Sequence, residues 1–253
     1  MKSSLKLPGA SFATILLMAI RCLCGAASYT TNPIADAFVT TGPSGNLSGD
    51  NFGAAGALAI AASGLPQGQF QSVLKFDLSG ARNSFDLQFG AGLWTPQSVT
   101  LQLTASPHGN AIFNNVAAGQ FNVSLMQNNS WVEGTGTGGI PTTDGISFNS
   151  LQSTFINNAA DEALGTFSFG GGTSGANDYA LVLAPGLVAK LLAGDVLSPR
   201  LFAADNSLSY LFGSRASGAG PQLTVIAVPE PGSIAVGVLG LATFLVWRSK
   251  TRP

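Results

Sequence analysis

Short runs of alternating polar and apolar residues limit most strongly what this chain can fold into. The alternation is complete from Ser98 to Ala105 and recurs from Val73 to Leu78. A period of two is the pattern of a β-strand with one buried face. Eight shorter runs rich in β-branched, aromatic or apolar residues predict further strands: Ile34–Thr40, Leu58–Ala62, Phe121–Met126, Thr166–Phe169, Tyr179–Ala184, Arg200–Ala204, Ser207–Phe212 and Gln222–Val228.

The segments between these runs are rich in glycine, asparagine and serine, as the turns of a β protein require. One helix is predicted over Pro185–Ala193, because a proline stands at its start and Gly194 follows its end. No linker or change of composition divides residues 28–228. We therefore expect an all-β fold with a single antiparallel β-sandwich domain at 28–228, most consistent with a jelly roll.

The N-terminal segment has the order of a secretory signal peptide. Lys2 and Lys6 precede an apolar run from Phe12 to Ile20, and Gly25-Ala26-Ala27 supplies the small residues of a cleavage site. We expect residues 1–27 to direct the chain to the Sec translocon and to be removed by signal peptidase after Ala27. Both cysteines, Cys22 and Cys24, lie in this segment, so the exported domain is predicted to contain no thiol and no disulfide.

The C-terminal segment has three parts in a fixed order. Pro229-Glu230-Pro231 is followed by an apolar stretch from Gly232 to Trp247 and then by a basic end, Arg248–Pro253. The apolar stretch predicts a short C-terminal transmembrane helix, whose marginal length suits a temporary anchor. The basic end predicts that this terminus stays in the cytoplasm and the domain lies outside. A plain membrane anchor is one interpretation.

The whole arrangement at 229–253 resembles the PEP-CTERM sorting signal, which exosortases recognise. These are membrane-embedded cysteine transpeptidases of Gram-negative bacteria. The resemblance implies that Pro229, Glu230 and Pro231 are recognition residues for that partner. It also implies transient anchoring in the inner membrane, followed by transfer to the cell surface or extracellular matrix.

Charge excludes one class of partner for the domain. The chain has a formal net charge of -1, but residues 28–231 contain five basic and twelve acidic residues, which gives -7. The compensating positive charge lies in the two terminal segments. An acidic domain without a basic patch argues against binding to nucleic acid.

Residues suited to catalysis are scarce in the predicted domain. His108 is its one histidine and stands in a turn, where no neighbouring residue orients it as a base. The absence of cysteines and of a histidine cluster excludes a zinc site. The acidic residues could pair as glycosidase carboxylates, but none stands in a hydrolase motif. We expect no enzymatic activity.

Calcium is a candidate metal, since it binds carboxylates, side-chain amides and carbonyls, which β-sandwich loops supply. Asp36 and Asp50 are the candidate ligands, although the loop around Asp50 lacks the regular spacing of a dedicated calcium loop. The alternative is that both are ordinary turn or strand-end aspartates.

Four motifs resemble the DNRLRE-type domain, a β-sandwich related to carbohydrate-binding modules. They are Asp36-Ala37-Phe38-Val39, Asn51-Phe52-Gly53, Phe76-Asp77-Leu78 and Trp131-Val132-Glu133-Gly134, and they occur in the family's order. Gln69–Ser72 departs from the family, which has an arginine-rich approach at that place. The resemblance implies a surface protein with a sandwich fold.

Two tryptophans are candidates for contact with a sugar ring. Trp94, between Leu93 and a Thr-Pro pair, is expected to be exposed and is the better candidate. For Trp131 we favour a structural role, with its indole packed under the sandwich and Glu133 capping a turn. These features together predict a non-enzymatic protein of the exopolysaccharide matrix or biofilm. The alternatives are a carbohydrate-binding module for a defined glycan and, less favoured, a polysaccharide hydrolase or lyase.

Overall fold

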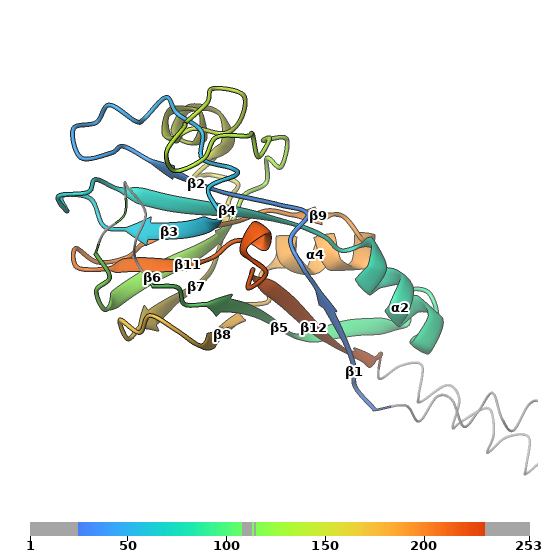
Figure 1. Cartoon of the computed structure of the whole chain (residues 1–253). Coiled ribbons are helices and arrows are strands. Elements are labelled where there is room, and N and C mark those ends of the chain that lie inside the picture. Colours follow the sequence, from blue (N-terminus) through green and yellow to red (C-terminus); the bar gives the residue numbers. More distant parts are fainter. Residues whose placement is uncertain (1–24, 108–112, 114, 231–253) are drawn as a thin grey trace, which may run out of the picture.

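The computed structural model describes residues 25–107, 113 and 115–230. Two antiparallel sheets form the domain (Figure 1). The four-stranded sheet has the order β1 (Ala27–Thr31), β12 (Gln222–Pro229), β5 (Trp94–Thr104) and β8 (Ala176–Leu181). The predicted all-β sandwich is therefore confirmed at the level of two packed antiparallel sheets.

The eight-stranded sheet has a main path of six strands. Its order is β11 (Ser209–Gly213), β3 (Ala57–Ala61), β4 (Phe70–Asp77), β10 (Pro199–Ala203), β6 (Gly119–Leu125) and β7 (Glu162–Phe169). Two more strands, β2 (Ala35–Thr40) and β9 (Val196–Leu197), pair with β4. The ten predicted runs all contain strands with bounds close to those expected, whereas β1 and β9 were not predicted.

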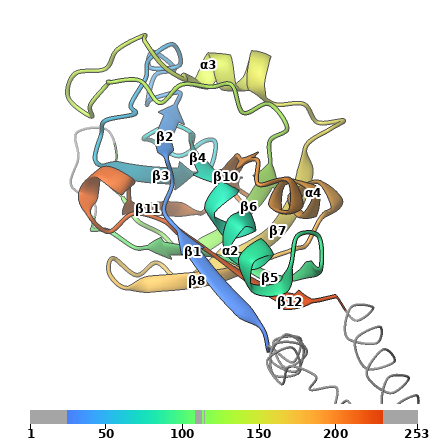
Figure 2. The same cartoon turned by 90° about the vertical axis from the view of Figure 1, so that its right-hand side faces the viewer.

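Two longer helices lie beside each other at one end of the sandwich (Figure 2). The predicted helix is confirmed as α4 (Pro185–Ala193), with Pro185 in its first turn and Gly194 in a left-handed conformation after its end. The second helix, α2 (Ser79–Phe89), was not predicted. It buries Ala81 and Phe85, which stand four residues apart on one face.

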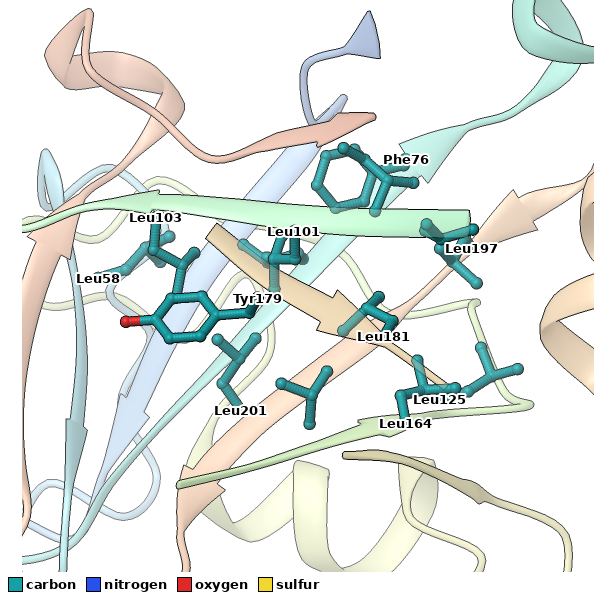
Figure 3. Close-up of a cluster of buried hydrophobic side chains, with 14 of the residues drawn as sticks. Leu58, Phe76, Leu101, Leu103, Leu125, Leu164, Tyr179, Leu181, Leu197 and Leu201 are labelled. Atoms are coloured by element: carbon teal, nitrogen blue, oxygen red, sulfur yellow. The ribbon is translucent and has the colours of Figure 1, made fainter. Parts of the chain in front are cut away.

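The main core lies between the two sheets. Leucines and aromatic rings from both inner faces meet there, and Figure 3 shows Leu101, Leu103 and Tyr179 of the smaller sheet near Leu58 and Leu201 of the larger one. These side chains are buried because each strand places alternate residues on its inner face. The period-two pattern in the sequence corresponds to this arrangement.

A second apolar cluster covers the opposite face of the larger sheet. Val39 of β2 and Val73 of β4 pack there with Trp131, Ile146 and Leu151. The last two belong to a segment that continues through α3 (Phe148–Ser150) and the π-helix Leu151–Phe155. The larger sheet is thus buried on both faces over β2 and β4, which explains why five consecutive residues of β2 are buried.

Candidate functional site

Two of the motifs that suggested a domain family are in direct contact. The side chain of Asn51 donates from Nδ2 to the backbone carbonyls of Glu133, at 2.6 Å, and Ile146, at 2.9 Å. Its Oδ1 accepts from the backbone N–H groups of Gly53 and Gly136, each at 3.1 Å. A Cβ at Gly53 would overlap the carbonyl of Glu133, so a glycine is needed for this close approach. The Asn-Phe-Gly and Trp-Val-Glu-Gly motifs therefore hold two loops together.

Asp36, Glu133 and Arg215 form a charge cluster beside this junction. The carboxyl of Asp36 is 1% exposed and accepts from the backbone N–H of Arg215 at 2.7 Å. The guanidinium of Arg215 donates to the carboxylate of Glu133 at 2.5 Å. Glu133 thus forms an ion pair, and the turn-capping role expected for its side chain is not what the structure shows.

The environment of Asp36 favours its protonated form. Burial is the main cause that raises the pKa of Asp36 from 3.8 to about 6, while the hydrogen bond from the Arg215 backbone opposes the shift and the charge of Glu133 adds to it. The second carboxyl oxygen of Asp36 is buried and has no hydrogen-bond partner among the described residues. A raised pKa in an acid can mark a functional site.

Next to the cluster, a pocket of about 460 Å³ opens on the outer side of the smaller sheet. Arg215 lines it together with Asn32, Gln102, Thr104 and Gln222. These four polar side chains come from the end of β1, from β5 and from β12, where outward residues alternate with buried leucines. The pocket therefore combines amide groups, a hydroxyl and one guanidinium.

The pocket continues into a polar sheet face. Thr30, Thr224 and Thr100 lie side by side on β1, β12 and β5, and the hydroxyls of Thr30 and Thr224 are 2.8 Å apart. Gln102 donates to Asp178 of β8 at 2.8 Å. The face can exchange hydrogen bonds with a hydroxyl-rich molecule, since it offers both donors and acceptors.

The expected exposure of Trp94 is wrong. Trp94 is 1% exposed, packs on Phe85 of α2 with ring centroids 4.9 Å apart, and donates from Nε1 to Asp86 at 2.7 Å. Because both ring faces are buried, the indole is not available for stacking on a sugar. The unpredicted helix α2 covers it.

The structural interpretation of Trp131 agrees with its position. The ring is 1% exposed and donates from Nε1 to Ser198 at 2.6 Å. The ammonium of Lys75 lies 4.5 Å from the ring centroid and donates to the backbone carbonyl of Trp131 at 2.6 Å. Burial lowers the pKa of Lys75 from its ordinary value.

The two candidate calcium ligands have different surroundings. The charged neighbours of Asp36 are Glu133 and Arg215, while the backbone of Asp50 is bonded to Leu47 in its own loop. Within the described ranges, no group of three His, Cys, Asp or Glu side chains could hold a metal ion. A calcium ion shared by Asp36 and Asp50 stays a prediction. His108 lies outside the described residues.

The first residue of the Pro-Glu-Pro motif belongs to the smaller sheet, and the second is hydrogen-bonded just beyond its edge. Pro229 is the last residue of β12 and pairs with Trp94, and the N–H of Glu230 donates to the carbonyl of Leu93 at 3.0 Å. Pro231, the apolar stretch 232–247 and nearly all of the predicted signal peptide lie outside the described residues. Within the part of the chain that is described, no helix is long and apolar enough to cross a membrane.

Sequence reasoning did not single out Arg215, Gln102, Gln222 or Asn32. The two glutamines could be recognised only as outward residues of alternating strands, and Arg215 only as one of five basic residues in the domain. Their convergence depends on the pairing of β12 with β5, which no local pattern encodes. No known protein-family model matches the chain, and no curated protein sequence matches it either.

Proposed function

We propose that this chain is an exported, non-enzymatic protein of the cell surface or extracellular matrix that an exosortase processes at its Pro-Glu-Pro motif. The PEP-CTERM resemblance suggests this role, and one structural observation supports it. The start of β1 pairs with the end of β12, so that Ala27 lies opposite Ala227. The predicted signal-peptide cleavage site and the sorting motif are therefore neighbours at one corner of the domain (Figure 1).

This arrangement suits a protein that two membrane enzymes process. Before cleavage, both apolar segments would leave the domain from the same corner, so both could enter one bilayer without strain on the sandwich. Signal peptidase would then free the N-terminal end, and the C-terminal segment would hold the domain until the exosortase acts.

Alanine substitution of Pro229, Glu230 and Pro231 tests the proposal in a host that contains the exosortase. The variant should accumulate in the membrane fraction at its unprocessed mass, because the apolar segment remains while the motif is gone. The control replaces two exposed loop prolines, Pro66 and Pro107, with alanine and should be processed normally. Equal processing of the motif variant and the wild type would refute the assignment.

The strand order supports a jelly-roll connectivity, which we propose as the finer description of the fold. Eight strands, β1, β4, β5, β6, β7, β8, β10 and β12, can be numbered one to eight along the chain. They then have the order 1-8-3-6 in the smaller sheet and 2-7-4-5 in the larger. This is the arrangement of two interleaved Greek keys, which occurs in lectin and capsid domains. Fold alone does not carry a function.

Binding of a neutral glycan is the second candidate function, and the polar pocket favours it. Asn32, Gln102 and Gln222 present amides that can donate to and accept from neighbouring sugar hydroxyls. Among the described residues, no aromatic side chain lines the pocket, so binding would rest on hydrogen bonds and be weak for a single site. Many copies in a matrix would compensate by multivalency.

A glycan array and a matrix co-sedimentation assay test this second candidate. Joint replacement of Gln102 and Gln222 by alanine should abolish retention on the preferred glycan, while replacement of the exposed Gln88 on α2 should leave it unchanged. Unchanged retention by the double variant would remove the pocket from consideration as the glycan site.

A further inference from the structure

The sorting motif begins inside the folded sheet, without a linker. Val228 pairs with Thr95, Pro229 pairs with Trp94, and Glu230 is bonded to Leu93. The partner strand is firmly held at this point, because Trp94 is buried against α2 and bonded to Asp86. The first two residues of the motif are therefore covered along one edge, Pro229 by β5 and Glu230 by the preceding Leu93.

In this position, only one residue separates the last residue bonded to the domain from the predicted membrane segment. Glu230 is bonded to Leu93, the residue before β5, and the apolar stretch begins at Gly232. Proteins that recognise an extended peptide often do so by pairing with its main chain as an added strand. While the motif is docked, one edge of its main chain is already paired within the domain, so the enzyme cannot pair with that edge.

Residues 228–230 can leave the sheet without disturbing the core. Val228, Pro229 and Glu230 are only half-buried, and Pro229 has no N–H to lose. Ala227 is different, since it is 0% exposed and pairs with Ala27 on one side and Pro96 on the other. Detachment would stop there. Three released residues supply about 10 Å of extended chain at about 3.3 Å each.

We infer that the end of β12 detaches from Leu93–Thr95 before the exosortase acts, and that docking of the motif on β5 limits the rate of processing. This inference rests on the proposed function. The docked and detached forms are a local equilibrium of a strand end, of the kind that native domains show at weakly packed termini. The rate of processing should therefore rise and fall with the fraction of molecules whose motif is detached.

A cross-strand disulfide tests the inference in the full chain, expressed with the exosortase. Thr95→Cys with Val228→Cys would lock the motif onto β5. Directly paired residues in antiparallel strands have Cα atoms about 4.5–5.5 Å apart, within the range for a disulfide. Thr100→Cys with Thr224→Cys places the same crosslink further along the same strand pair and is the matched control. The only natural cysteines lie in the predicted signal peptide.

We expect the oxidised Thr95–Val228 variant to be processed at least tenfold more slowly than the wild type and to recover when dithiothreitol is added. The control crosslink should leave the rate unchanged. A non-reducing gel establishes that each crosslink has formed. Wild-type processing of the oxidised Thr95–Val228 variant would overturn the inference.

A linker variant provides a second test, in the wild type and in the crosslinked variant. Six Gly and Ser residues inserted between Val228 and Pro229 would place the motif about 13 Å from the sheet. The insertion should speed processing of the wild type and rescue the oxidised Thr95–Val228 variant. Failure to do either would also overturn the inference. If the wild type is not processed, or if the alanine-substituted motif is processed like it, the proposed function itself fails.

Discussion

The side-chain amide of Asn51 donates to the backbone carbonyl of Glu133 across 2.6 Å and so joins the loop after β2 to the loop after β6. Asn51 is 0% exposed and makes three further hydrogen bonds, to Gly53, Gly136 and Ile146. All four involve main-chain groups, and three of them, of Glu133, Gly136 and Ile146, lie in a loop distant in sequence from Asn51. The Asn51 side chain thus supplies hydrogen-bond partners for main-chain groups that have none in a helix or strand.

Asn51→Asp tests this role with almost no change of volume. An oxygen in place of Nδ2 would face two carbonyl oxygens, so two buried acceptors lose their donor. We expect a loss of about 2–5 kcal/mol in the free energy of unfolding, measured by urea denaturation of residues 27–230. Asn83→Asp on the exposed side of α2 is the control and should change stability little. Similar midpoints for both variants would show that the contacts of Asn51 are dispensable.

The charge cluster predicts an unusual pH dependence. Because the pKa of Asp36 is raised from 3.8 to about 6, the folded state holds more protons than the unfolded state between these values. Stability due to Asp36 is therefore highest below about pH 4 and is lost as the pH rises through about 6. The difference amounts to about 3 kcal/mol.

Asp36→Asn should remove this dependence, since the amide does not titrate and can still accept from the Arg215 backbone. Urea denaturation between pH 4 and 7 with a chelator present gives both profiles. The wild type should lose stability relative to the variant as the pH rises. A relative gain would mean that the Asp36 carboxylate is stabilised as an anion.

The predicted calcium site can be tested on the same two proteins. A cation bound by Asp36 and Asp50 would stabilise the folded form by mass action, so calcium should raise the melting temperature of the wild type by several degrees. Magnesium should do much less, and Asp36→Asn should lose the effect. Identical melting of chelated and calcium-loaded wild type would exclude the site.

The sequence predicts most strands of this fold, but it does not predict the features that depend on contacts between distant segments. Alternation finds β5 and β4 because each has one face in the core, but β1 lacks a clear pattern and is fixed by its pairing with β12. Helix α2 carries Ala81 and Phe85 at a helical spacing, a signal that a pass for period two overlooks. The pocket could not be predicted, since its residues meet only through strand pairing.

Trp94 shows most clearly why a local interpretation fails. Its neighbours indicate a turn, yet α2 folds over the ring and supplies Asp86 as the acceptor for the indole N–H at 2.7 Å. This hydrogen bond is the main cause that lowers the pKa of Asp86. The contact lies between residues eight positions apart. It requires helix α2, which the search for alternating residues overlooked.

Trp94→Phe should therefore raise the pKa of Asp86 toward its ordinary value while the ring still packs on Phe85. The carboxyl pKa is followed by NMR titration. We expect the free energy of unfolding, measured by urea denaturation, to fall, because the variant loses the hydrogen bond to Asp86 and some buried apolar area. Trp131→Phe is the matched control: it removes a donor to Ser198 and should leave the Asp86 pKa unchanged.

Both variants should keep any glycan binding of the wild type, since both rings are buried. Loss of binding in Trp94→Phe alone, with the fold intact, would restore Trp94 as a sugar contact.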